Sequence, residues 1–112
     1  MAFGPYPATV VKLIDGDTMR LDIDLGFDVR YGSNCRVYGI NAPELRTPQG
    51  KEALAFAATL VKAGDQVKVF SCGWDKYGGR FDGDVVLSED RSFATLMLDA
   101  GHAVVYKGGA RS

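Results

Sequence analysis

Hydrophobic and polar residues alternate along several segments of the chain, which is the pattern of half-buried β-strands. The alternation is strictest over residues 19–25, where apolar side chains occupy every second position and Arg20, Asp22 and Asp24 lie between them. A β-branched run over residues 8–14 precedes this strand, and Asp15-Gly16-Asp17 between the two has the composition of a hairpin turn. A third strand is predicted to run through residues 27–31 and 35–40, and two later strands cover residues 66–70 and 80–87.

Two segments have helical periodicity instead. The first begins at Thr47-Pro48, a hydroxyl cap followed by a proline in the first turn, and it is predicted to end at Gly64. The second is predicted to have its cap near Ser88 or Asp90 and to stop at Gly101. The apolar stripes of the two helices consist of Leu54, Ala57, Ala58 and Val61, and of Phe93, Leu96, Met97 and Ala100.

The order of these elements predicts an α+β, mainly β, fold. Three strands, a helix, two strands and a helix match the connectivity of a five-stranded OB-type barrel with two helices, and most strand pairs are expected to be antiparallel. A chain of 112 residues is long enough for one hydrophobic core. We therefore expect a single domain over residues 1–112, with residues 1–7 and 107–112 as flexible ends.

Composition limits the classes of partner. The net charge of −1 gives no overall basicity, so any site for a nucleic acid has to be local. The first residues do not resemble a signal peptide, and no stretch approaches the roughly 18 apolar residues of a membrane span. Two distant cysteines do not make a zinc motif or a disulfide framework. These features predict a soluble, cytoplasmic protein with no membrane partner, and they are compatible with a monomer.

Polar residues that could carry chemistry occur in turns and at strand ends. Asp17 lies in the first turn, Asn41 and Glu44 follow the third strand, Arg36 points outward from that strand, and Arg80 begins the fifth. Closure of the barrel would bring the first turn beside the exit of the third strand. Carboxylate, amide and backbone oxygens there would suit a hard cation such as Ca²⁺.

Pro43 bears on the backbone in this stretch. It biases Ala42 toward extended geometry, which leaves the Ala42 carbonyl free to bind a cation. Taken singly, each of these features also has an ordinary reading, as a hairpin turn, a solvated loop carboxylate or a surface charge. Only their combination favours a site.

Three motifs, IDGDT at 14–18, CRVYGINAPE at 35–44 and DKYGGRF at 75–81, resemble the staphylococcal nuclease (thermonuclease) family in order and spacing. The resemblance implies a five-stranded OB barrel and a Ca²⁺-dependent phosphodiesterase that cleaves DNA and RNA. It implies metal ligation by Asp17, by Asn41 and by the backbone carbonyl of Ala42. The family's catalytic residues fall on Arg36, Glu44 and Arg80, and a pair that contacts a terminal phosphate falls on Lys76 and Tyr77.

These residue types suit phosphodiester hydrolysis. Attack of water builds negative charge on the equatorial phosphate oxygens, which guanidinium groups and a divalent ion stabilise while a carboxylate takes the proton of the water. Arginine stays charged and its planar fork can bind two phosphate oxygens. The only histidine, His102, follows the stop of the second helix, so a mechanism that needs two histidines is excluded.

The sequence also departs from the family. Asn41 replaces a metal-binding aspartate, which predicts weaker binding of calcium because the amide brings no charge. Two glycines precede Arg80 where one is commoner, and we expect Gly78 and Gly79 to absorb the extra residue as a bulge. Tyr106 is the nearest match to the aromatic residue that stacks on the nucleotide. The sequence ends at Ser112, before the third helix of larger members.

Two functions remain open on the sequence alone. The first is the metal-dependent nuclease. The second is a non-catalytic OB-like module that binds nucleic acid or protein. Retention of Asp17, Arg36, Glu44 and Arg80 favours catalysis, whereas the aspartate lost at position 41 favours the binding module.

Overall fold

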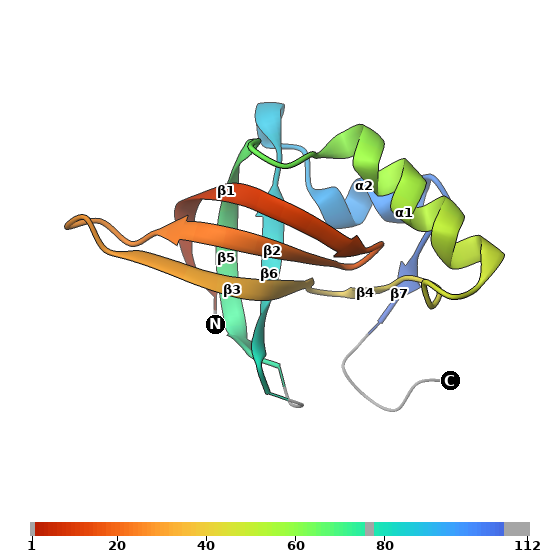
Figure 1. Cartoon of the computed structure of the whole chain (residues 1–112), viewed down its shortest axis with the longest axis horizontal. Coiled ribbons are helices and arrows are strands. Elements are labelled where there is room, and N and C mark those ends of the chain that lie inside the picture. Colours follow the sequence, from red (N-terminus) through yellow and green to blue (C-terminus); the bar gives the residue numbers. More distant parts are fainter. Residues whose placement is uncertain (1, 76–77, 107–112) are drawn as a thin grey trace.

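The computed structural model describes residues 2–75 and 78–106 (Figure 1). Within these residues, five strands close a barrel in the order β1-β2-β3-β6-β5. Their bounds are Phe3–Asp15 for β1, Thr18–Asp24 for β2, Arg30–Val37 for β3, Gln66–Trp74 for β5 and Arg80–Val86 for β6. All pairs are antiparallel except β3 with β6, which are parallel. The predicted five-stranded OB-type barrel is confirmed.

A second, two-stranded sheet and the helices lie at one end of the barrel (Figure 1). The short strand β4 (Ile40–Asn41) pairs with β7 (Val104–Val105), and the helices are α1 (Pro48–Leu60) and α2 (Phe93–Asp99). A single 3₁₀ turn, η1, covers Ser88–Asp90. Within the described residues, neither helix is both long and apolar enough to cross a lipid bilayer.

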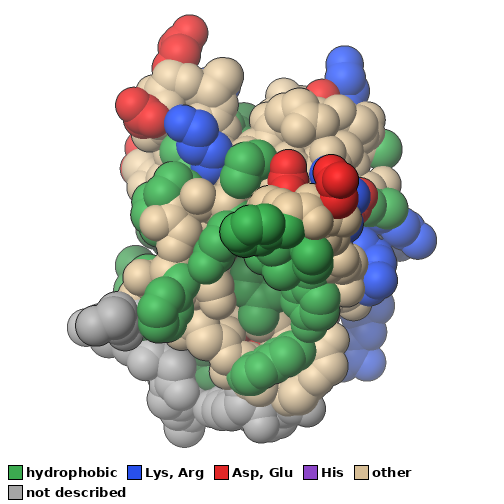
Figure 2. All heavy atoms as spheres, turned by 90° about the vertical axis from the view of Figure 1, so that its left-hand side faces the viewer, with side chains coloured by type: hydrophobic (Ala, Val, Ile, Leu, Met, Phe, Trp, Pro, Cys, Tyr) green, Lys and Arg blue, Asp and Glu red, His purple; other side chains and the backbone are tan. Residues whose placement is uncertain are grey.

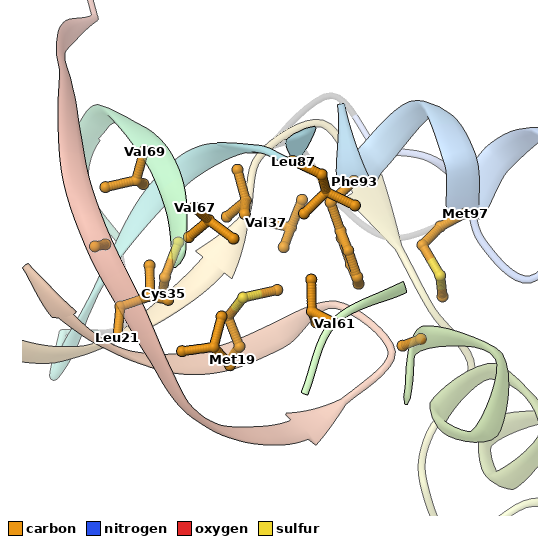
Figure 3. Close-up of a cluster of buried hydrophobic side chains, with 14 of the residues drawn as sticks. Met19, Leu21, Cys35, Val37, Val61, Val67, Val69, Leu87, Phe93 and Met97 are labelled. Atoms are coloured by element: carbon orange, nitrogen blue, oxygen red, sulfur yellow. The ribbon is translucent and has the colours of Figure 1, made fainter. Parts of the chain in front are cut away.

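The hydrophobic core fills the barrel and continues under the helices. The alternation predicted over residues 19–25 is confirmed for Met19, Leu21 and Ile23, which are buried. It is wrong for Leu25, which follows the end of β2 and is exposed. Phe93 and Met97 of α2 close the helical end of the barrel, and both are fully buried (Figure 3). The remaining labelled members of this cluster are Cys35, Val37, Val61, Val67, Val69 and Leu87.

The other end of the barrel is open. Figure 2 shows this face, away from the helices, with hydrophobic side chains arranged around a hollow. The hollow measures about 310 Å³, and its lining includes Phe3, Tyr6, Tyr31, Trp74 and Phe81. The barrel therefore has one end plugged by helices and one end that exposes aromatic side chains.

The β2–β3 hairpin differs from the sequence prediction. Residues 27–31 were expected to begin the third strand, but Phe27 and Asp28 adopt left-handed backbone angles in a turn, with φ of 56° and 59°. The Phe27 side chain is 100% exposed, and the strand begins at Arg30. Apolar residues occupy the tip of this hairpin, so the apolar–polar alternation of the sequence continues through the turn. Alternation alone therefore placed the start of the strand too early.

The bounds of several other elements also differ from the predicted ones. β1 begins at Phe3, so residues 3–7 are a paired part of the barrel that runs along β5 and not a flexible end. α1 has the predicted cap, since Thr47 Oγ1 accepts from Gly50 N–H at 3.0 Å, but it ends at Leu60. The cap of α2 predicted near Ser88 or Asp90 is wrong, because Glu89 and Asp90 take left-handed angles in the separate turn η1. The cap is Ser92, whose hydroxyl accepts from the Thr95 N–H.

Truncation of Phe93 tests the plug that α2 provides. Phe93→Ala is expected to lower the free energy of unfolding by about 3–5 kcal/mol, because it removes a fully buried aromatic ring. Chemical denaturation followed by circular dichroism measures the change. Phe27→Ala is the matched control and is expected to stay within about 0.5 kcal/mol. Equal effects of the two substitutions would mean that α2 does not close the barrel.

Candidate active site

Asp17 joins the first hairpin turn to the exit of β3. Its Oδ2 accepts from the Ala42 N–H at 2.8 Å, and its Oδ1 accepts from the Thr18 hydroxyl at 3.0 Å. Its backbone carbonyl accepts from the Val37 N–H at 2.7 Å. The Asp17 side chain is buried, so these bonds form away from solvent. The predicted approach of the first turn to the segment after β3 is therefore present.

Arg36 extends outward from β3 into this cluster. Its Nη2 donates to Asn41 Oδ1 at 3.1 Å and lies 3.7 Å from Asp17 Oδ2. Its Nη1 donates to the Val37 carbonyl at 3.3 Å, and its Cζ lies 4.9 Å from the centre of the Tyr106 ring. The outward direction was predicted, but the side chain is only 9% exposed. Asn41 in β4 and Tyr106 after β7 both contact the guanidinium, and strand alternation could not indicate these contacts.

Arg80 lies on the neighbouring strand, on the same face. β3 and β6 pair in parallel, so that Asn34 lies beside Arg80 and Arg36 beside Asp82. The Arg80 Nε lies 3.3 Å from the Oδ2 of Asp75, and the Asp75 side chain is buried. The two arginines predicted to be catalytic therefore emerge from adjacent strands, two positions apart along the ladder.

The two glycines before Arg80 lie in the turn between β5 and β6. Gly78 and Gly79 have φ of 77° and 75°, a region that glycine adopts without strain. The Asp75 N–H donates to the Arg80 carbonyl at 3.0 Å, which closes the loop. The register shift between β5 and β6 lies between Ser71 and Gly73. Gly78 and Gly79 precede β6, so the predicted bulge is not found at these two glycines.

Two carboxylates that sequence reasoning assigned no role lie beside the arginines. Burial raises the pKa of Asp82, and the neighbouring Asp75 raises it further, while Arg36 and Arg80 act in the opposite direction. Within the described residues, Asp82 Oδ1 is buried without a hydrogen-bond partner. The alternation of Arg80 and Asp82 along β6 was the available clue, since residues two apart share a face.

The described contacts of Glu44 are with residues of its own loop. Its carboxylate pairs with Arg46 at 2.7 Å, its side chain is 54% exposed, and none of the described hydrogen bonds joins it to Arg36 or Asp17. Its backbone carbonyl accepts from both the N–H and the hydroxyl of Thr47, which fixes the loop to the start of α1. Glu44 is therefore held by its backbone and has an open, solvated side chain. Lys76 and Tyr77 lie outside the described residues.

The carboxylates of Asp15 and Asp17 and the amide of Asn41 are oxygen donors of the kinds that hard divalent cations take in proteins. Asp15 Oδ1 accepts from the Asp17 N–H at 3.0 Å, and burial, with the adjacent Asp17 carboxylate, raises the pKa of Asp15 to about 6. A bound cation reduces the electrostatic repulsion between two neighbouring carboxylates. The described residues include no group of three or more His, Cys, Asp or Glu side chains placed to hold a metal. The further donors would be the amide oxygen of Asn41, now engaged by Arg36, and backbone carbonyls.

The closed five-stranded barrel with its two helices defines an OB-fold protein. A family model for the staphylococcal nuclease homologue matches residues 34–112. The chain belongs to this family. The matched stretch contains Arg36, Asn41, Glu44 and Arg80, whereas Asp17 precedes it. A search of curated protein sequences finds no match.

Gly50 provides a test of how the Glu44 loop is held. A Cβ at this buried position would overlap the carbonyl of Glu44 and lie 2.9 Å from Leu45 Cα. Because backbone cannot move aside as a flexible side chain can, Gly50→Ala is expected to destabilise the protein by about 1–3 kcal/mol. Denaturation measures this, with the exposed neighbour Gln49→Ala as control. A Gly50→Ala variant as stable as Gln49→Ala would contradict the packing described.

Proposed function

We propose that the protein is a calcium-dependent nuclease that hydrolyses phosphodiester bonds of DNA and/or RNA. The observation that carries the proposal is the cluster in which the Arg36 guanidinium lies against Asp17 and Asn41, with Arg80 on the next strand. Family membership supports a nuclease-type activity. A guanidinium beside a carboxylate and an amide oxygen gives one place where a phosphate and a cation can bind together.

In this proposal one Ca²⁺ would be held by Asp17, Asn41 and the Ala42 carbonyl. When bound, the ion supplies positive charge that polarises a phosphate oxygen. Asp17 already has an oxygen oriented by the Ala42 N–H, which fixes that carboxylate relative to the Ala42 backbone. The ligand set carries less charge than one with an aspartate at position 41, so its affinity for calcium is modest.

The chain's own groups handle the charge and the proton. Arg36 and Arg80 donate to the non-bridging phosphate oxygens as negative charge builds there. Glu44 accepts a proton from the attacking water, the new P–O bond forms, and the leaving oxygen departs on the opposite side and takes a proton from solvent. For this, Glu44 exchanges its partner Arg46 for the water. The proposed stacking partner of the nucleotide is Tyr106, and the proposed contacts to its terminal phosphate are Lys76 and Tyr77. We propose that the protein acts as a monomer.

A binding module without catalysis is the second candidate. Two observations favour it: Asn41 Oδ1 accepts from Arg36, and the Glu44 carboxylate pairs with Arg46. In that case the arginine face would bind a phosphate backbone without hydrolysing it. Binding that persists with no cleavage under any divalent metal would support this alternative.

Digestion of plasmid DNA and of RNA separates the two functions. The proposal expects cleavage with calcium, loss of cleavage with a chelator, and a loss of about 10²–10⁴-fold in Glu44→Gln because the base is removed. Glu52→Gln, at an exposed position of α1, is the matched control and is expected to cleave normally. Cleavage that survives both the chelator and Glu44→Gln would come from a contaminant and would remove the support for a nuclease.

The proposed role of Asn41 as a calcium ligand leads to a separate prediction. Asn41→Asp is expected to tighten calcium binding by about tenfold, which is about 1.4 kcal/mol, because a second charge is added beside Asp17. Isothermal titration calorimetry measures the affinity. Asn34→Asp adds the same charge on the same face of β3 and is the control. If Asn41→Asp binds calcium no more tightly than the parent, Asn41 is not a ligand.

A further inference from the structure

We propose that Arg20 forms a second phosphate-binding subsite, displaced along the strands from Arg36, which holds the nucleic-acid strand that flanks the reacting phosphate. This inference rests on the proposed function. The outer face of β2, β3 and β6 carries it, because side chains two apart on each strand share that face.

Strand register places Arg20 in a row with the candidate site. Arg20 pairs with Asn34 across β2 and β3, and Asn34 pairs with Arg80 across β3 and β6. The next row toward the helices is Thr18, Arg36 and Asp82, by the same pairings. Arg20 and Arg80 therefore flank Asn34 on one face, one row from Arg36. Two residues along a strand span about 6.7 Å, which is comparable to the separation of neighbouring phosphates in an extended strand.

The charge of Arg20 is not neutralised by a described neighbour. Its Nη1 donates to Asn34 Oδ1 at 3.3 Å, and this amide orients the guanidinium without removing its charge. Ion pairs within the described residues join Arg30, Arg36, Arg46 and Arg80 to carboxylates, and none involves Arg20. An exposed, oriented guanidinium with its charge intact is suited to a phosphate oxygen.

The surface beside Arg20 is open. Gly32 lies in the next row, and a Cβ there would meet Arg20 Nη2 at 3.3 Å, so the guanidinium lies over a backbone without a side chain. Asp22 pairs with Gly32, but its carboxylate is held by Arg30 Nε at 3.0 Å, which offsets the nearest negative charge. The guanidinium thus points away from Arg36, and only a strand longer than the reacting dinucleotide reaches both.

Binding of a single-stranded thymidine oligonucleotide tests the subsite. An OB fold covers about 4–16 nucleotides, so a fluorescent oligomer of about twelve is used, in calcium, with Glu44→Gln as background to prevent cleavage. Arg20→Gln is expected to weaken binding roughly tenfold. It is also expected to reduce the slope of log K against log salt by about 0.7, the value for one phosphate contact to a single strand. Arg20→Lys is expected to restore most of the slope.

Arg91→Gln is the matched control. Arg91 is exposed, its Nε donates to the Ser88 carbonyl, and it lies beyond the end of β6 that is remote from Arg80. The same loss of affinity and slope in Arg91→Gln as in Arg20→Gln would overturn the subsite, because only overall charge would then matter. Unchanged binding in Arg20→Gln would overturn it too.

The same samples distinguish the subsite from the proposed function. If the protein with Glu44 intact cleaves the oligonucleotide but Arg20→Gln binds and cleaves like the parent, the subsite alone fails. If the parent binds through Arg20 but never cleaves, nuclease activity fails and the subsite stands as part of a binding module. If the parent does not bind the oligonucleotide at all, both fail.

Discussion

The buried carboxylate of Asp17 is the contact on which the arrangement of the site depends. It fixes the β1–β2 turn to the backbone of Ala42, and the same turn accepts a bond from Val37. Both segments come from different parts of the chain and meet only because the barrel closes. A buried charge is tolerated when it is hydrogen-bonded and paired, and here Thr18, Ala42 and Arg36 provide these partners.

Positive and negative groups of the site are already in contact within the protein. Arg36 contacts Asp17 and Asn41, Arg80 contacts Asp75, and Asp82 lies between the two arginines. A phosphate that binds here has to compete with protein carboxylates for the guanidinium groups. A cation that binds near Asp15 and Asp17 would neutralise one side of that competition and leave Arg36 available to the phosphate.

The sequence predicted the barrel well and the details of the site less well. The alternation in β2 and the Thr47-Pro48 cap depend only on residues that are close together in the sequence, so short segments were enough to predict them. The burial of Arg36 depends on contacts with Asn41 and Tyr106, which only the fold brings together. Asp82 was missed because a carboxylate between two arginines is recognisable only after the register of β3 and β6 is known.

The most direct test of this account is a calcium titration followed by amide NMR. A saturable shift of the Asp17 and Ala42 amide resonances is predicted, because these two residues are joined by a hydrogen bond inside the proposed metal site. The resonances of Tyr31 and Trp74, at the open end of the barrel, should not move. Saturable shifts at the open end, or none at Asp17 and Ala42, would contradict a metal-dependent site at the exit of β3.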